Sequence, residues 1–386
     1  MTPDDIPLAL YVHLPWCVQK CPYCDFNSFT APGELPTDSY LEALIADLDL
    51  NRELAGDRTL VSIFLGGGTP SLFPPGAIKR LVNAIRDRYV VAEDAEITME
   101  ANPGTVECGD PAGYRAAGIN RLSIGAQSFA DKSLKILGRI HSSAAIRDSF
   151  AAARSAGFDN INLDIMYGLP GQDVPAAIAD IDALVELSPE HISWYHLTLE
   201  PNTVFHARPP DNLPGEELAA DIQDAGARRL AAAGYEQYEV SAWSRPGRRC
   251  RHNLNYWKFG DYLAAGAGAH GKISRADGVC RFERPANPRA YMAALCSRSA
   301  IEPRPVSEPD VIFEFMLNAL RLTSGFELGH FERTTGQPRS RVEPTLESFA
   351  QRGLIDGLAA GKVVPTERGF CYLIELMSTF LPATEG

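Results

Sequence analysis

The chain has 386 residues and a formal net charge of −13, and 45% of its residues are apolar. This length allows one large domain and a small one, and the acidic balance argues against broad nucleic-acid binding. Eight cysteines do not suggest a disulfide scaffold at this length, the N-terminus lacks a basic signal-peptide opening, and no apolar run approaches the ~20 residues that span a bilayer. We therefore expect a cytoplasmic protein, and peripheral association with a membrane is compatible with these features.

Short apolar, β-branched runs alternate with amphipathic stretches along most of the chain. The expected strands begin near Leu8, Leu60, Glu96, Arg121, Asn160, His191 and Tyr235. The expected helices lie at Ser39–Glu53, Ala77–Tyr89, Ala144–Ala156, Ala176–Leu187 and Glu216–Ala233. This alternation predicts a parallel sheet, open or closed into a barrel, with its chemistry on the loops at the C-terminal ends of the strands.

Three cysteines, Cys17, Cys21 and Cys24, follow the first expected strand in the spacing C-x3-C-x2-C. A fully ligated [4Fe–4S] cluster takes four cysteines, so three thiolates from one loop leave one iron open to a small molecule with an amine and a carboxylate. S-adenosylmethionine (SAM) is such a molecule, and reduction of the cluster would cleave it. The alternative is a structural zinc loop, but such loops usually take a fourth Cys or His from a paired motif, and the other five cysteines are scattered.

Polar residues and glycines follow the next expected strands. The second strand ends in Gly66-Gly67-Gly68-Thr69-Pro70, and no Gly-Lys-Ser/Thr follows, so a P-loop is excluded. Glycine carbonyls without side chains can closely approach a ligand ammonium group, although a tight turn is an equal alternative. Glu100 and Asp164, beside Gln127 and Arg139, suit ribose hydroxyls, an amine and a carboxylate, whereas each residue alone would more often be a cap or a surface charge.

The character of the sequence changes after Ala300, where a Pro-rich segment indicates a linker. A helix with an apolar stripe at Ile312, Phe315, Met316, Ala319 and Leu320 follows. A second helix is expected near Val342–Arg352, a hairpin around Gly361–Val364 and a final helix near Phe370–Phe380. Helices followed by a hairpin predict a small winged-helix-like α+β domain, and its lack of a Lys/Arg cluster favours packing or docking over DNA binding.

These motifs together resemble the radical SAM superfamily and, within it, the group of oxygen-independent coproporphyrinogen III oxidase and the HemW-type heme chaperones. The resemblance implies a partial (β/α)6 TIM-like barrel followed by a smaller C-terminal domain. It implies a [4Fe–4S] cluster on Cys17, Cys21 and Cys24. The positions that match SAM contacts are Tyr11, Tyr23, Gly67, Gly68, Thr69, Glu100, Gln127, Arg139 and Asp164. On this basis we divide the chain into a radical SAM barrel at 1–240, a barrel extension at 241–300 and a C-terminal domain at 301–386.

Two features separate the branches of this group. The oxidases carry a further cysteine two positions after the third cluster cysteine, where this chain has Phe26. Conversely, His252-Asn253-Leu254-Asn255-Tyr256-Trp257 matches the HNxxYW motif that is associated with heme binding in the chaperone branch. A neutral imidazole is a common axial ligand of heme iron, and Tyr256 and Trp257 would lie against the porphyrin.

The residues around this motif leave alternatives open. Arg245, Arg248, Arg249 and Arg251 are expected either to pair with the heme propionates or to form a solvated face. Cys250 is an alternative thiolate ligand or a covalent attachment site. His270, in Gly266-Ala267-Gly268-Ala269-His270-Gly271, is either another candidate ligand or an ordinary turn histidine.

We therefore expect a heme chaperone that binds heme, the cluster and SAM and transfers heme to an acceptor hemoprotein, which can be a membrane protein. An electron donor for the cluster is a second expected partner, nucleic acid is not expected, and a homodimer is compatible with the resemblance. The alternative is a SAM-dependent coproporphyrinogen III oxidase, which decarboxylates propionate side chains to vinyl groups. Phe26 disfavours this enzyme, and the His252 motif favours the chaperone.

Overall fold

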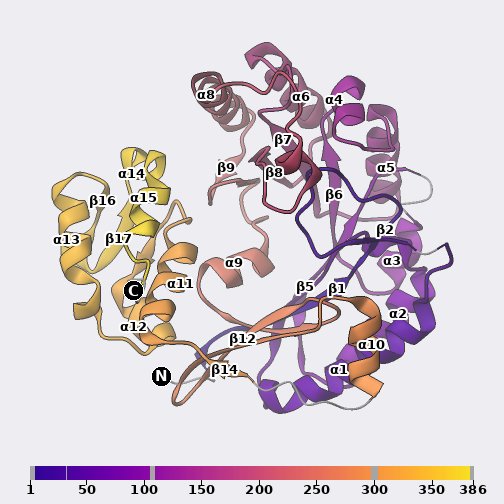
Figure 1. Cartoon of the computed structure of the whole chain (residues 1–386), viewed down its shortest axis with the longest axis horizontal. Coiled ribbons are helices and arrows are strands. Elements are labelled where there is room, and N and C mark those ends of the chain that lie inside the picture. Colours follow the sequence, from indigo (N-terminus) through magenta and orange to yellow (C-terminus); the bar gives the residue numbers. More distant parts are fainter. Residues whose placement is uncertain (1–4, 32, 105–108, 297–302, 383–386) are drawn as a thin grey trace.

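The computed structural model describes residues 5–31, 33–104, 109–296 and 303–382. Twelve of its strands form one curved sheet in the order β14-β13-β12-β11-β1-β4-β5-β6-β7-β8-β10-β9. Figure 1 shows helices on the outer side of this sheet and the C-terminal domain, in yellow, beside its open side. The predicted boundary at residues 300–301 lies outside the described residues.

Six parallel strands form the barrel wall: β1 (Leu8–Leu14), β4 (Leu60–Gly67), β5 (Val91–Ala101), β6 (Arg121–Gln127), β7 (Ile161–Tyr167) and β8 (His191–His196). The helices between them are α1 (Thr37–Ala55), α2 (Pro75–Arg86), α3 (Pro111–Ala116), α4 (Asp131–Ile136), α5 (Ser143–Ser155) and α6 (Val174–Leu187), and α7 (Val204–Ala207) and α8 (Glu216–Ala232) follow β8. The predicted fold class, a partial TIM-like barrel with a small second domain, is confirmed.

Strands β1 and β6 are almost continuously buried because both faces of the sheet are covered. In β1, six of the seven residues are buried, and all seven residues of β6 are buried. The helices begin where the sequence supplies caps: Ser142 accepts from the Ala145 amide at the start of α5, and Asp173 accepts from the Ala176 amide at the start of α6. Strand pairing and helix caps together place the C-terminal ends of all six strands at one edge.

The strand expected near Tyr235 is different from the prediction. The structure has only the two-residue β9 (Glu236–Gln237), which pairs antiparallel with β10 (Ala242–Ser244), and β10 pairs antiparallel with β8. The chain turns back at Tyr238, whose amide donates to the Ala242 carbonyl, so the series of parallel strands stops there. The next parallel strand, β11 (Asp261–Ala265), instead lies at the opposite edge, beside β1.

The sheet extends beyond the barrel on the side of β11. The helix α9 (Arg251–Trp257) precedes β11, and β12 (His270–Arg275), β13 (Gly278–Glu283) and β14 (Arg304–Pro305) continue the sheet with antiparallel pairing. The helix α10 (Pro288–Cys296) then packs near α1 (Figure 1).

The C-terminal domain has the winged-helix order of elements. These are α11 (Glu308–Ala319), β15 (Phe326–Glu327), α12 (Leu328–Thr335), α13 (Glu343–Gln351), β16 (Ile355–Asp356) and β17 (Lys362–Pro365). The three strands form a small antiparallel sheet, and α14 (Glu367–Cys371) and α15 (Leu373–Ser378) replace the single final helix that the sequence predicts. Phe315 is fully buried in this domain and contacts Phe259 after α9, which joins the two cores.

A buried ion network ties β11 to its neighbours. The Asp261 carboxylate is fully buried and accepts from Arg58 Nη1 at 2.7 Å, from Lys272 Nζ at 2.9 Å and from the Ser274 amide at 2.9 Å. Burial alone would raise the pKa of Asp261, but the charge of Lys272 and the hydrogen bonds of the other partners outweigh it and lower this pKa. The network therefore depends on an ionised carboxylate.

Replacing Asp261 with Asn should lower the free energy of unfolding by about 3–5 kcal/mol at pH 7, because two buried cations lose their counter-ion. Urea denaturation measures this loss. Since the pKa of Asp261 is lowered by folding, its contribution is present above the unfolded carboxyl pKa and is lost as the pH falls below about 4. The difference between wild type and variant should therefore shrink in acid.

The matched control is Asp38→Asn, which removes the exposed ion pair with Arg80. An exposed pair contributes at most about 1 kcal/mol. Equal losses in the two variants would contradict a special role for the buried network.

Candidate functional site

The cysteine loop is held between two short strands. The strand β2 (Trp16–Cys17) pairs in parallel with β3 (Phe29–Thr30), and the Cys24 amide donates to the Cys21 carbonyl at 3.1 Å. Lys20 Nζ closes the loop by donating to the Phe26 and Ser28 carbonyls at 3.0 and 3.2 Å. Cys17 is buried, Cys21 and Cys24 are half-buried, and burial raises the pKa of the Cys24 thiol.

All three cysteines line one cavity of about 390 Å³. Most of the predicted SAM residues line it too: Tyr23, Gly67, Gly68, Glu100, Gln127, Arg139 and Asp164. We call this space the smaller cavity. It lies at the C-terminal edge of the barrel strands, as the strand–helix alternation predicts.

Glu100 and Gly67 form one wall of the smaller cavity. The Gly67 amide donates to Glu100 Oε2 at 2.9 Å, and Gly67 has φ = 115°, a conformation that L-residues rarely adopt. Burial raises the pKa of Glu100 to about 7; the Gly67 hydrogen bond opposes this shift and the charge of Asp164 adds to it. Glu100 can therefore accept or donate near neutral pH.

Asp164 is held by side chains of neighbouring strands. Its carboxylate accepts from Asn162 Nδ2 at 2.7 Å and from Ser123 Oγ at 3.1 Å. Burial raises the pKa of Asp164, and hydrogen bonds from Ser193, Asn162 and Ser123 oppose that rise. Its orientation is therefore fixed before a ligand arrives.

Arg139 and Gln127 meet on the opposite wall. Arg139 donates to Asn102 Oδ1 at 2.6 Å, to the Gly125 carbonyl at 2.7 Å and to Cys21 Sγ at 3.5 Å. Gln127 has φ = 67° and accepts from the Tyr195 hydroxyl at 2.7 Å. Tyr195 also lines the smaller cavity, and sequence reasoning missed it because its strand gives no signal beyond an apolar run.

Two predicted SAM residues lie apart from the smaller cavity. Thr69 is buried behind it, where its hydroxyl accepts from Asn102 Nδ2 at 3.0 Å. Tyr11 lines a different space, and its hydroxyl hydrogen-bonds to His13 Nδ1 at 2.9 Å. From these positions Thr69 can orient Asn102, and Tyr11 can orient His13.

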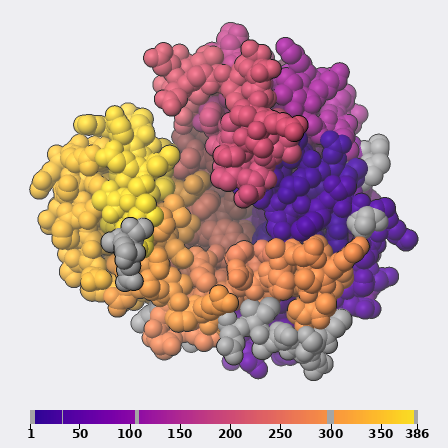
Figure 2. All heavy atoms as spheres, viewed as in Figure 1, coloured from indigo at the N-terminus to yellow at the C-terminus, as the bar shows by residue number. Residues whose placement is uncertain are grey.

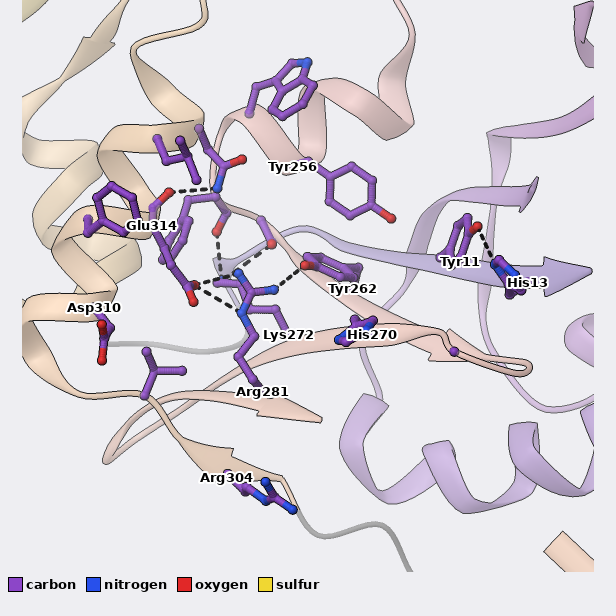
Figure 3. Close-up of a pocket in the computed structure, with 18 of the residues that line it drawn as sticks. Tyr11, His13, Tyr256, Tyr262, His270, Lys272, Arg281, Arg304, Asp310 and Glu314 are labelled. Carbon is purple, nitrogen blue, oxygen red and sulfur yellow. Dashed lines mark hydrogen bonds and ion pairs between the residues drawn. The ribbon is translucent and has the colours of Figure 1, made fainter. Parts of the chain in front are cut away.

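A larger cavity of about 1170 Å³ lies between the barrel, the extension and the helix α11. Figure 2 shows the molecule hollowed between the yellow C-terminal domain and the barrel, and Figure 3 shows residues that line this cavity. The two cavities adjoin, because Phe26, Gly67 and Glu100 line both.

The residues of the HNxxYW motif lie on α9 and face different surroundings. Tyr256 and Trp257 line the larger cavity (Figure 3). His252 does not line it: the ring is 1% exposed, Nδ1 bonds to Ser62 Oγ at 3.0 Å, and Nε2 bonds to the Tyr256 hydroxyl at 2.9 Å. Burial lowers the pKa of His252 to about 3, so this imidazole is neutral.

The four arginines before α9 lie away from the larger cavity. Arg251 pairs with Asp94 at 3.0 Å, Arg248 with Asp159 at 3.4 Å and Arg249 with Glu236 at 3.6 Å. Arg245 donates to the Ala233 carbonyl at 2.6 Å. These partners lie at or before the beginnings of the barrel strands, opposite the cysteine edge, so the arginines do not form the wall of either cavity.

The two alternative ligands are also separated. Cys250 is fully buried, and burial raises its pKa to about 12, which keeps the thiol protonated. His270 is exposed and lines the larger cavity. In the described part of the chain, no three Cys, His, Asp or Glu side chains lie close enough together to bind one metal ion. A [4Fe–4S] cluster does not require such a group, because each cysteine thiolate binds a different iron of the cluster.

Comparison with known proteins gives two family matches: residues 11–185 match the radical SAM superfamily, and residues 306–372 match the HemN C-terminal domain. "Heme chaperone HemW" of Escherichia coli is 45% identical over 97% of this chain and 98% of its own length. "Heme chaperone HemW" of Bacillus subtilis is 33% identical over 97% and 99%.

The chain belongs to the HemW family of radical SAM proteins. Among solved structures, coproporphyrinogen III oxidase (HemN) from Escherichia coli is similar, with a TM-score of 0.82, 24% identity and coverage of 98% of this chain and 90% of that one. That likeness supports the fold. In the HemW-family chain, Phe26 is 57% exposed in the wall that the two cavities share.

The donor set of the smaller cavity fits the two cofactors that a radical SAM family implies. Three cysteines in one loop, with Arg139 beside Cys21, fit a cluster with an open iron position. Glu100, Asp164 and Gln127 supply acceptors for ammonium and hydroxyl groups, and Gly67 and Gly68 line the same cavity. The residues present therefore fit a [4Fe–4S] cluster and SAM.

Replacing Cys21 with Ala should abolish the visible absorbance of the reconstituted cluster and lower the bound iron, because a two-cysteine loop cannot hold a cubane. The matched control is Cys371→Ala, since Cys371 is exposed in the C-terminal domain. An unchanged spectrum in the Cys21 variant would end the cluster assignment.

Replacing Asp164 with Asn should weaken SAM binding about tenfold or more while leaving the iron content unchanged. A hydrogen bond to a charged acceptor contributes about 1.5–3 kcal/mol, and 1.4 kcal/mol is a factor of ten. Equilibrium dialysis with SAM measures the change. Asp148→Asn, on the exposed face of α5, is the control, and loss of iron in the Asp164 variant would indicate damage to the fold instead.

Proposed function

We propose that this protein is a heme chaperone, which binds one heme in the larger cavity and transfers it to an acceptor hemoprotein. The observation that supports this most is the juxtaposition of the larger cavity with the smaller one, across Phe26, Gly67 and Glu100. A bulky cargo and SAM would then lie on two sides of one wall. The HemW relatives, 33–45% identical, are named heme chaperones and support the same proposal.

The lining of the larger cavity suits a flat, apolar ring with carboxylates. Its aromatic and aliphatic members include Tyr11, Phe26, Tyr256, Trp257, Phe259, Tyr262, Pro305, Val306, Phe313 and Leu317. Of its cations, Lys272 is paired with Asp261 and Arg281 with Glu314, whereas Arg304 has no ion-pair partner within the described residues. Arg304 is therefore available to a propionate group.

The cluster and SAM belong to the smaller cavity in this proposal. When bound, they supply one-electron reductive chemistry next to the cargo. Cys17, Cys21 and Cys24 hold the cluster, Glu100, Asp164 and Gln127 hold SAM, and Arg139 fixes the Cys21 side of the loop. We propose that their occupancy controls heme binding or release, since Phe26, Gly67 and Glu100 line both cavities.

The remaining parts of the proposal concern partners and location. The chaperone would act in the cytoplasm, take electrons from a separate donor and deliver heme to an acceptor that can be membrane-bound. Within the described residues, no helix is both long and apolar enough to cross a bilayer. We further propose that residues 1–240 and 241–300 form one binding unit and that residues 301–386 close the larger cavity. We also propose that the protein forms a homodimer.

Titration of the anaerobically reconstituted protein with hemin, followed by absorbance, should show saturable binding of one heme per chain. A parallel assay with coproporphyrinogen III, SAM and a reductant should yield no protoporphyrinogen. Product formation would instead establish the alternative, a coproporphyrinogen III oxidase, despite Phe26 at the position of the oxidases' further cysteine.

The position of the heme is tested by Leu317→Asp. Leu317 is 41% exposed and lines the larger cavity, so the added charge should repel the propionates and weaken hemin binding severalfold without unfolding the protein. Ile374→Asp is the matched control, because Ile374 is 81% exposed on α15 and outside that cavity. Equal affinity in the two variants would place the heme elsewhere.

A further inference from the structure

Two of the described residues that line the larger cavity are histidines, and their ring nitrogens differ in availability. His13 is buried, with Nδ1 bonded to the Tyr11 hydroxyl at 2.9 Å and Nε2 bonded to the Asn27 carbonyl at 2.9 Å. Both nitrogens of His13 are therefore occupied. His13 cannot bind a metal without losing a hydrogen bond in a buried place.

His270 is different, because its side chain is 68% exposed. No hydrogen bond to its ring occurs within the described residues, and its nearest charged neighbour is Glu283, with 3.8 Å between Nδ1 and Oε2. Figure 3 shows His270 on strand β12, near Tyr262 and facing the same space as Tyr256. Its Nε2 is thus free to bind an iron ion, while Glu283 stands on the side of Nδ1.

The tyrosine hydroxyls that line this cavity are occupied. The hydroxyl of Tyr256 bonds to His252, that of Tyr11 bonds to His13, and that of Tyr262 accepts from Arg281. The thiols of Cys17, Cys21 and Cys24 line the smaller cavity and not the larger one. Among the histidine and tyrosine side chains that line the larger cavity, His270 is therefore the one with an available ligand atom.

The backbone under His270 is rigid, which a ligand requires. His270 begins β12 and pairs with Glu283 of β13. The turn before it is fixed by Asn27, whose Nδ2 donates to the Ala267 carbonyl at 2.9 Å, and by the Arg284 amide, which donates to the Ala269 carbonyl at 2.9 Å. The ring is thus mobile only about its own side-chain torsions.

We propose that His270 Nε2 is the axial ligand of heme iron in the larger cavity, and that His252 is a positioning residue that orients Tyr256 against the porphyrin. This rests on the proposed heme chaperone function. The lone pair of Nε2 would form the bond to ferric iron and displace a water from the iron to solvent, so no electron would move. A carboxylate beside Nδ1 is the usual second partner of a metal-binding imidazole.

The test compares His270→Ala with wild type in titrations with hemin and with metal-free protoporphyrin IX. Hemin affinity should fall at least about tenfold, since even outer partners of metal ligands contribute about 10- to 100-fold. The Soret band of bound hemin should shift, and added imidazole should restore it. Affinity for metal-free protoporphyrin IX should be unchanged, which a merely structural role of His270 would not produce.

The control is His206→Ala, on α7, because His206 is exposed and lines neither cavity. An unchanged hemin spectrum and affinity in His270→Ala would overturn the inference. So would loss of the hemin spectrum in His252→Ala together with its retention in His270→Ala, which would make His252 the ligand. A wild-type protein that binds no hemin would instead overturn the proposed function itself.

Discussion

The pairing of β1 with strands on both of its sides determines where the chemistry of this protein lies. One edge of β1 pairs with β4 and the other with β11, both in parallel, so a strand from the end of the barrel sequence lies beside the first strand. All parallel strands end at one edge, which puts the cysteine loop after β1 next to the turn after β11. Asn27 then bonds across this junction to Ala267.

The residues at this junction line or support both cavities. The cysteine loop ends at Phe26 and Asn27: Phe26 forms part of the shared wall, and Asn27 holds the turn that leads to His270. Gly268 permits this contact, since its φ is 75° and a Cβ there would lie 2.2 Å from Asn27 Nδ2. The loop that carries Cys24 therefore contributes to the shared wall and contacts the turn before His270.

The carboxylates inside the molecule are of two kinds: some pair with buried cations and stabilise the fold, and others line the smaller cavity. Asp261 and Asp47 satisfy buried cations and stabilise the extension: Asp261 pairs with Lys272, and Asp47 pairs with Arg284 at 2.6 Å. Neither Glu100 nor Asp164 forms an ion pair within the described residues, and burial raises the pKa of each. Carboxylates that are buried, hydrogen-bonded and not neutralised are suited to a cationic ligand such as SAM.

The sequence by itself determined the elements whose signals are local. The spacing of Cys17, Cys21 and Cys24 and the strand–helix alternation predicted the fold class, and most of the SAM residues that the family resemblance implied line the smaller cavity. The HNxxYW motif is equally visible, but its local pattern could not show that His252 faces Ser62 and Tyr256 while Trp257 faces the larger cavity. A short helix sends neighbouring residues in different directions, and only packing decides which side is buried.

Only the tertiary structure decided the larger cavity and its free histidine. The arginines at 245–251 cluster in sequence, yet their partners at Asp94, Asp159 and Glu236 hold them at the other end of the barrel. The sequence left His270 open between a candidate ligand and an ordinary turn histidine, because its place in the cavity depends on β11 pairing with β1 and on α11 lying beside the open side of the sheet. Such long-range pairing depends on how distant apolar strands and helices bury one another, which no local pattern encodes.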